Sequence, residues 1–287
     1  MKQLAVIGVG LIGGSFAKDF KGLYPETRVV GIDQNEAHLA EALALGVIDK
    51  AGDLTDLVAS DMVFMAIPVD ATLALLPSVL EAVGAHAVVT DAGSTKASLC
   101  AAVATHPKRR NYLAAHPIAG TEFSGPSAAV AGLFKGKTHI ICEVEQTAFQ
   151  LQEKALDIFR AMGMRIRYMN AAAHDTHIAY MSHLSHISSF MLGKTVMEKE
   201  KNERDIFDMA GSGFESTVRL AKSSPAMWAP IFKDNKAAVI ESLQEYIENL
   251  SSFKKLMEKG DFEAVFKEME ATNKIKGILN DIPNSNK

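Results

Sequence analysis

The chain has 287 residues, of which 48% are hydrophobic and 22% charged, a composition typical of a globular protein with one large or two ordinary domains. The formal net charge of −4 disfavours a nucleic-acid partner, and no apolar run approaches the ~18 residues that span a membrane. Cys100 and Cys142 form neither a disulfide framework nor a metal-type spacing, so we expect a cytoplasmic protein.

The first part of the chain alternates apolar runs with helical patterns. The N-terminal run is interrupted by four glycines, so it predicts a strand rather than a signal peptide. Because strands that alternate with helices form βαβ units, the pattern predicts a parallel sheet with helices on both faces. The predicted strands are residues 4–8, 28–33, 62–68, 87–93, 111–117 and 138–144, followed by a helix over 149–163 and a strand over 164–169.

The predicted secondary structure changes after Asn170 from alternating strands and helices to helices. From Ala171 onward the patterns are helical: one runs over about 172–200, one over about 235–258, and one follows Asp261, a predicted N-cap. We therefore expect an α/β domain followed by an all-α domain. The predicted domains are residues 1–170 and 171–287.

A glycine-rich turn follows the first predicted strand. Gly8, Gly10 and Gly13 have the G-x-G-x-x-G spacing of a dinucleotide site, and a helix beginning near Leu11 would direct its free N–H groups at phosphates. Asp33, at the end of the second strand, would accept hydrogen bonds from ribose hydroxyls and repel a 2′-phosphate, which favours NAD over NADP. The alternative is a glycine-rich turn in an unrelated α/β protein, which the strand–turn–helix context disfavours.

Ligands of open α/β sheets bind beyond the carboxyl ends of the strands. The predicted strand 62–68 ends in Ile67 and Pro68, which we interpret as apolar packing around a cofactor, and Ser94 directly follows the predicted strand 87–93. His116 ends the strand 111–117, where Pro117 disfavours helix and so directs the imidazole. His116 is either a structural histidine or a general base that Ser94 orients. The predicted cofactor-binding residues are Gly8, Gly10, Leu11, Ile12, Gly13, Asp33, Ile67, Pro68 and Ser94.

Four histidines cluster in the first helix of the second half. At about 100° per residue, His174 and His177 share one face, whereas His183 and His186 lie on roughly the opposite one, so we expect no metal site and one pair at the interdomain cleft. Further along, Arg219 is either a clamp for a substrate carboxylate or a solvated surface residue.

The motifs GVGLIGGS, DAGSTK, AHPIAGTE, HLSH and VRLAKSSPAMW, in that order, resemble the prephenate/arogenate dehydrogenase family of tyrosine biosynthesis. The similarity extends from the first strand to about residue 250. It implies a Rossmann domain followed by a helical dimerisation domain, with a homodimer formed through the helices and the active site between the domains. It also implies the NAD-dependent oxidative decarboxylation of prephenate to 4-hydroxyphenylpyruvate, with the conversion of arogenate to tyrosine as the alternative.

The resemblance implies roles for individual residues. His116 would be the catalytic histidine and Ser94 its assistant, Arg219 would hold a substrate carboxylate, and His183 and His186 would line the substrate side. Glu122 would act as a gate or polar partner. The implied substrate-binding residues are Arg219, His183, His186, Glu122, Thr121 and Gly213.

Two other functions fit parts of the pattern. A β-hydroxyacid-type dehydrogenase would place a catalytic lysine in the first long helix of the second domain, where this chain has histidines and Lys194 stands well past them. An NAD-sensing binding protein would need no base at the edge of the sheet, so His116 near Ser94 disfavours it.

Overall fold

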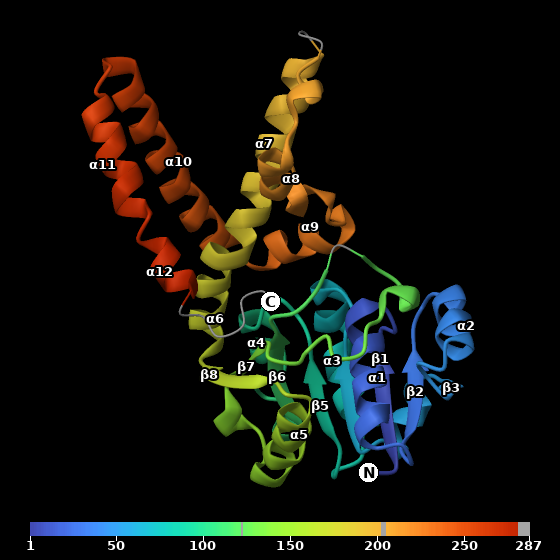
Figure 1. The fold of residues 1–287 in the computed structure, drawn as a ribbon. Coiled ribbons are helices and arrows are strands. Elements are labelled where there is room, and N and C mark those ends of the chain that lie inside the picture. The colour runs from blue at the N-terminus through green and yellow to red at the C-terminus, as the bar shows by residue number, and fades with distance from the viewer. Residues whose placement is uncertain (122, 202–204, 281–287) are drawn as a thin grey trace. The chain divides into compact units, whose positions relative to one another are not determined.

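The structure is a computed structural model that describes residues 1–121, 123–201 and 205–280 (Figure 1). It consists of two compact units, Met1–Asn235 and Lys236–Lys287. The first unit contains an α/β sheet and a set of helices that follows it. The second unit is helical in its described part.

One eight-stranded sheet organises the first unit, in the order β3-β2-β1-β4-β5-β6-β7-β8. The order reverses between β1 and β4, and such a switch point is where open α/β sheets bind ligands. The strands are β1 (Gln3–Ile7), β2 (Arg28–Ile32), β3 (Lys50–Ala51), β4 (Met62–Met65), β5 (Val88–Asp91), β6 (Tyr112–Pro117), β7 (Thr138–Cys142) and β8 (Arg165–Met169).

The sheet is parallel from β3 to β6, but β7 runs antiparallel to β6. In its described residues, 118–121 and 123–137, the connection between β6 and β7 contains one 3-10 turn and no crossover helix, and the chain returns in the opposite direction. The predicted parallel sheet is therefore confirmed at every other strand pair, including β7 with β8, and differs at the pair of β6 and β7. The edge strand β3 is only two residues long, too short to produce a periodic signal in the sequence.

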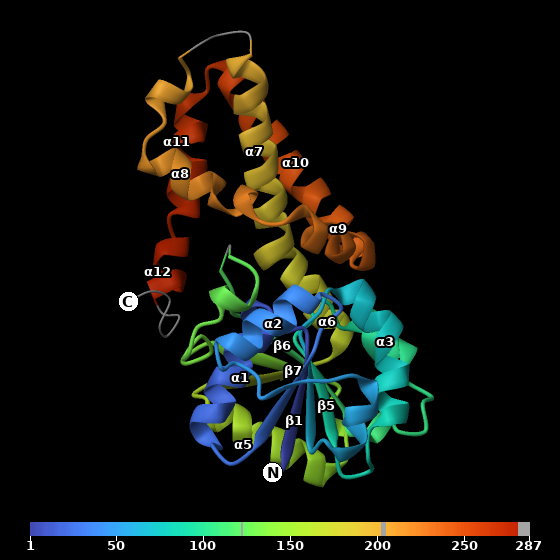
Figure 2. The same ribbon diagram turned by 90° about the vertical axis from the view of Figure 1, so that its right-hand side faces the viewer.

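Helices cover both faces of the sheet. Figure 2 shows α1 and α5 on one side of it and α3 on the other. The helices of the first unit are α1 (Leu11–Leu23), α2 (Glu36–Ala44), α3 (Val69–Ala82), α4 (Ala97–Ala102), α5 (Phe149–Ala161), α6 (Ala171–Ile178), the π-helical turn η5 (Ala179–His183), α7 (Leu184–Glu200), α8 (Ser212–Val218) and α9 (Pro225–Asp234). Short 3-10 turns are η1 (Leu54–Ala59), η2 (Arg109–Asn111), η3 (Pro126–Ala128), η4 (Val144–Gln146), η6 (Phe207–Met209) and η7 (Arg219–Lys222).

Alternate residues of β1 belong to two separate hydrophobic clusters, one on each face of the sheet. Leu4 and Val6 belong to the cluster beneath α1 and α5, whereas Ala5 and Ile7 belong to the cluster beneath α3 and α4. Because successive side chains of a strand point to opposite faces, an uninterrupted apolar run is what a sheet covered on both faces requires.

In the second unit, α10 (Lys236–Lys259) contacts α11 (Phe262–Thr272), and α12 (Ile275–Asn280) follows. Gly260 adopts a left-handed φ of 72° in the turn between α10 and α11. The predicted N-cap is present, since the Asp261 carboxylate accepts a hydrogen bond from the backbone N–H of Ala264 at 3.1 Å.

No helix within residues 1–121, 123–201 and 205–280 combines the length and apolarity needed to cross a membrane.

We predict that Phe16→Ala lowers the free energy of unfolding by about 3–5 kcal/mol, because it opens a cavity in a packed core. Phe16 of α1 is fully buried and stacks on Phe64 of β4 with ring centroids 3.9 Å apart. The matched control is Phe149→Ala in α5, since Phe149 is 70% exposed. Urea denaturation of both variants is the measurement; equal losses in the two would contradict the assignment of Phe16 to the core.

Candidate active site

The glycine turn joins β1 to α1 at the switch point of the sheet. Gly8 has a φ of 90°, and a Cβ there would lie 2.5 Å from the carbonyl oxygen of Ala66. A Cβ on Gly13 would lie 1.9 Å from the carbonyl oxygen of Gly8. Both positions therefore require glycine for the turn itself, as the sequence pattern predicted.

Gly10, the N-cap of α1, is different. Among the described residues, a Cβ on Gly10 would meet no atom closer than the backbone nitrogen of Gly125, 3.9 Å away, so the packing of these residues does not require glycine here. The missing side chain leaves the start of a 13-residue helix open. Leu11 and Ile12 form the first turn of that helix, where unpaired N–H groups and the helix dipole favour a pyrophosphate.

The predicted acid at the end of β2 is held against the glycine turn. One carboxylate oxygen of Asp33 accepts a hydrogen bond from the backbone N–H of Val9 at 3.1 Å, and the other accepts from Asn35 at 2.9 Å. Ile67, just after β4, packs against the same turn, since its Cγ2 would lie 2.7 Å from a Cβ on Gly8. Pro68, the N-cap of α3, is exposed. Asp33 and Ile67, two of the residues predicted around a dinucleotide, therefore lie against the glycine turn.

His116 lies near the end of β6, opposite Ile140 of β7, and is 8% exposed. Its Nδ1 lies 2.9 Å from Nε2 of His174, whose Nδ1 lies 2.7 Å from a carboxylate oxygen of Asp175. Burial lowers the pKa of His116 well below its usual value. At neutral pH His116 is therefore uncharged and can accept a proton.

Ser94 does not make the contact predicted for it. It lies half-buried between β5 and α4, and no hydrogen bond joins it to His116 in the described parts of the chain. His174 occupies that role instead. His174 and Asp175 were overlooked as partners of His116 because their shared site depends on α6 packing against the end of β6, which no local pattern specifies.

A buried ion pair lies directly behind His116. The Lys96 ammonium contacts the Asp91 carboxylate and donates to the carbonyl of Ala115 at 2.9 Å. Asp91 also accepts from the hydroxyl of Tyr112 at 2.7 Å and from the backbone N–H groups of Gly93 and Ala115 at 2.8 and 3.2 Å. The pair therefore ties the end of β5 to the strand that carries His116.

A second cluster surrounds the indole of Trp228 in α9. His186 stacks on Trp228 with centroids 3.5 Å apart, and the ring of His183 meets it edge-on at 5.8 Å. Burial lowers the pKa of His183 to about 4 and also lowers that of His186. Nε2 of His183 and Nε1 of Trp228 are buried and have no hydrogen-bond partner among the residues that the structure describes, an arrangement that a bound polar group would complete.

The predicted pairing of histidines by helix face is wrong. His174, His183 and His186 are buried, whereas His177 is exposed. The π-helical turn η5 inserts about one extra residue, so the residues after it are rotated by about 100° from the faces that a regular helix predicts. This rotation places His183 on the buried side together with His174.

Three other predicted substrate residues, Arg219, Gly213 and Thr121, lie on the surface. Arg219, at the start of η7, is exposed, and its charge contributes to the lowered pKa of His186, so it lies on the side of the tryptophan cluster. Gly213 is exposed in α8, and Thr121 is exposed in the loop after β6. Glu122 lies outside the described residues. No hydrogen bond joins Thr121 or Gly213 to His116 in the part of the chain that the structure describes.

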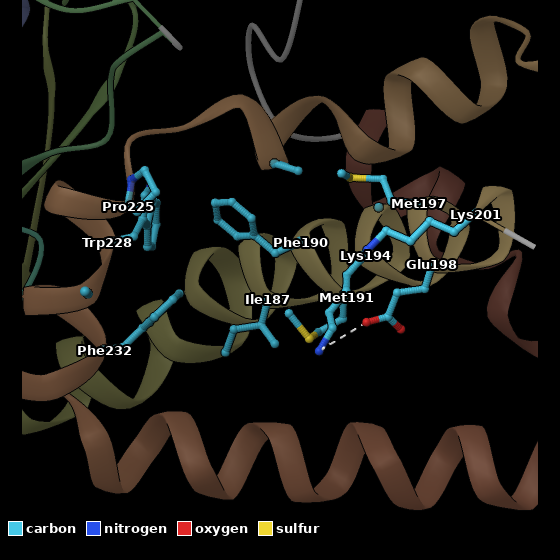
Figure 3. Close-up of a pocket in the computed structure, with 13 residues that line it drawn as sticks. Ile187, Phe190, Met191, Lys194, Met197, Glu198, Lys201, Pro225, Trp228 and Phe232 are labelled. Carbon is cyan, nitrogen blue, oxygen red and sulfur yellow. Dashed lines mark ion pairs between the residues drawn. The ribbon is translucent and has the colours of Figure 1, made fainter. Parts of the chain in front are cut away.

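An apolar cavity of about 610 Å³ lies beside α7, lined by Phe190, Met191, Met197, Trp228 and Phe232 among other residues. Figure 3 shows the aromatic rings of Phe190, Trp228 and Phe232 at one end and the ion pair between Lys194 and Glu198 at the other. The cavity shares Trp228 with the histidine cluster but does not reach His116.

Two family models match the chain in tandem. The nucleotide-binding domain of prephenate dehydrogenase matches residues 16–168, and the dimerization domain of prephenate dehydrogenase matches residues 170–271.

The chain is similar to several relatives over most of their length. The chain is 31% identical to a prephenate dehydrogenase of Bacillus subtilis over 92% of this chain and 72% of that protein. It is 29% identical to a cyclohexadienyl dehydrogenase of Zymomonas mobilis over 97% of this chain and 96% of that protein. A crystal structure of prephenate dehydrogenase from A. aeolicus, in complex with hydroxyphenyl propionate and NAD⁺, superimposes with a TM-score of 0.87 at 28% identity, over 98% and 99% of the two chains.

The glycine turn, the buried histidine at the end of β6 and the two consecutive domain matches lead to one conclusion: the chain belongs to the prephenate dehydrogenase family.

Proposed function

We propose that this chain catalyses the NAD⁺-dependent oxidative decarboxylation of prephenate to 4-hydroxyphenylpyruvate, with His116 as the general base. The observation that carries the proposal is His116 itself: a buried, uncharged imidazole near the carboxyl end of a central strand, in a sheet whose glycine turn suits a dinucleotide. Membership of the family supports the same reaction.

In this reaction NAD⁺ supplies a hydride acceptor for carbon 4 of the cyclohexadienol ring. The protein's part is to remove the proton of the hydroxyl at that carbon, and uncharged His116 has a ring nitrogen available for it. Loss of CO₂ then makes the ring aromatic, which drives the reaction forward. Proton acceptance near neutral pH requires an imidazole that is not already protonated, and burial of His116 provides this state.

The proposed cofactor site is the turn between β1 and α1. The backbone of Gly8, Gly10 and Gly13 and the first turn of α1 at Leu11 and Ile12 would receive the pyrophosphate. Asp33 would bind the adenosine ribose, and Ile67, Pro68 and Ser94 would line the path toward the nicotinamide.

The proposed substrate site extends from His116 toward the tryptophan cluster. Arg219 would hold a carboxylate of the dianionic substrate, and His183 and His186 would line the substrate side. The unpartnered buried nitrogen of His183 supports this role. Glu122, Thr121 and Gly213 complete the proposed set.

We further propose a domain boundary near Asn170 and a homodimer formed through the helical domain. The change of family model between residues 168 and 170 supports the boundary, and the similarity of residues 170–271 to the dimerization domain of prephenate dehydrogenase supports dimerisation. The two free, buried cysteines are compatible with a cytoplasmic location.

We predict that the purified chain reduces NAD⁺ faster with prephenate than with arogenate, and prefers NAD⁺ to NADP⁺ because Asp33 repels a 2′-phosphate. The measurement is absorbance at 340 nm with each pair of substrate and cofactor. A higher kcat/KM for arogenate would transfer the proposal to an arogenate dehydrogenase. Inactivity with both substrates despite NAD⁺ binding would reject the catalytic proposal.

We predict that His116→Asn lowers kcat by about 10²- to 10⁴-fold, because the mutant lacks a base in the proton-transfer step. The Kd of NAD⁺ should change by less than about twofold. His177→Asn is the matched control, since His177 is an exposed histidine of α6 and should retain normal turnover. Comparable kcat values for His116→Asn and the control would remove His116 from the mechanism.

We predict that Arg219→Ala raises the KM for prephenate about tenfold or more, with a smaller effect on kcat, because a charge-assisted contact to a carboxylate is lost. Lys222→Ala is the control, since Lys222 is another cation in η7. If both variants keep the wild-type KM, Arg219 is a surface residue without a substrate contact.

A further inference from the structure

We propose that His174 and Asp175 are positioning residues for His116. Asp175 determines which ring nitrogen of His174 carries the hydrogen, and His174 in turn determines which ring nitrogen of His116 carries it. We call the three side chains the histidine relay. This inference rests on the proposed function, in which His116 is the base, and it adds two residues of α6 to that mechanism.

The first contact of the relay joins Asp175 to His174. The Asp175 carboxylate accepts hydrogen bonds from the backbone N–H groups of Lys96 and Ala97, both at 2.8 Å, and lies 2.7 Å from Nδ1 of His174. A carboxylate has only acceptor atoms. Nδ1 of His174 must therefore carry the hydrogen and donate it to Asp175.

The second contact joins His174 to His116. Burial lowers the pKa of His174, so this imidazole is neutral at pH 7, and with hydrogen on Nδ1 its Nε2 is an acceptor. Nε2 of His174 lies 2.9 Å from Nδ1 of His116. His116 must therefore donate from Nδ1, which leaves the lone pair on Nε2 as its proton-accepting atom.

The relay also supports the charge that develops during turnover. When His116 removes the hydroxyl proton, the substrate O–H bond breaks and an Nε2–H bond forms, so His116 becomes an imidazolium. Its Nδ1–H then donates to neutral His174, whose opposite nitrogen is held by the negative charge of Asp175. Hydrogen bonds to a charged form stabilise that form, so the relay favours proton acceptance without a second proton transfer.

Other ionisable groups around the two rings leave this assignment intact. Lys96 is paired with Asp91, and the two charges of that pair offset each other. Burial lowers the pKa of His139 to about 3 and that of His183 to about 4, so both are neutral near pH 7. The groups that face His116 and His174 are Lys96, Asp91, His139, His183 and Asp175.

The position of Asp175 is determined from several elements. Its carboxylate caps the first N–H groups at α4, and its backbone carbonyl accepts from the side-chain amide of Asn235 at 2.7 Å. The amide of Asn170 caps α6 at its start, accepting from Ala173 at 2.7 Å. These contacts fix the orientation of the His174 ring, which has a fully buried side chain.

The test compares His174→Leu with His174→Gln. Leucine removes the acceptor for Nδ1 of His116, so kcat should fall about 100-fold, while the Kd of NAD⁺ and the KM for prephenate stay within about twofold. Glutamine offers an amide oxygen near the position of Nε2, so it should restore kcat to within about tenfold of the wild type. His177→Leu, on the exposed side of α6, should show wild-type kinetics.

The pH profile separates this role from a merely structural one. The acid limb of kcat/KM reports protonation of His116 in the free enzyme. Because the lost hydrogen bond stabilised protonated His116, His174→Leu should move this limb to lower pH as well as reduce its plateau. A fall in the plateau with an unmoved limb would mean that His174 serves packing alone and would overturn the proposal.

If the variants fold poorly, the proposal can still be tested on the wild-type chain, by measuring which ring nitrogens of His116 and His174 carry hydrogen. In the ¹⁵N NMR spectrum of the wild-type chain labelled at histidine, His116 and His174 should both show the Nδ1–H form at pH 7. In Asp175→Asn the amide can donate to His174, so both rings should change to the Nε2–H form and kcat should fall. An Nε2–H form of His116 in the wild type would refute the relay.

The outcomes also separate the relay from the function on which it rests. Normal turnover in His116→Asn would reject the proposed base and the relay together. Loss of turnover in His116→Asn with wild-type kcat in His174→Leu would reject the relay alone.

Discussion

The buried ion pair between Lys96 and Asp91 is the interaction on which the carboxyl edge of the sheet depends. Desolvating two charges is costly, and burial is tolerated because hydrogen bonds occupy the remaining positions around them. Asp91 receives donors from Tyr112, Gly93 and Ala115, and Lys96 reaches the carbonyl of Ala115. These bonds join the end of β5 to β6 at Ala115, the residue before His116. They therefore determine where the backbone of His116 lies.

Desolvation then determines the chemistry of the histidines. His116, His174 and His183 come from β6, α6 and η5, and burial is the largest cause of the lowered pKa of each. A buried neutral imidazole has one donor and one acceptor nitrogen, so its partners decide which nitrogen can accept a proton. Within the histidine relay, one carboxylate therefore orders two rings, and a single hydrogen-bonded row connects the helical segment to the sheet.

Local patterns were sufficient to predict much of the first unit. Gly8 and Gly13 were predicted correctly as required glycines because both fill steric roles that depend only on the turn between β1 and α1. In the second unit, the helix after Asp261 was also predicted from a local signal, because an N-cap side chain bonds a backbone N–H only three residues away. From the sequence, Ser94 was predicted as the residue that orients His116, and His174, whose ring lies 2.9 Å from it, was missed, because which side chain reaches the imidazole depends on how α6 packs. The π-helical turn η5 likewise left no periodic signal, and it rotated His183 by about 100° from the face that a regular helix predicts.

The sequence by itself determined the alternating α/β plan, the dinucleotide turn, the acid at Asp33 and the histidine before Pro117, since each depends on residues close together in the chain. Only the tertiary structure decided the antiparallel β7, the burial that keeps His116 uncharged and the partners His174 and Asp175. The physical reason is that hydrogen-bond partners and desolvation depend on which elements meet in space. Here the meeting residues are 58 positions apart in the sequence, so no local pattern connects them.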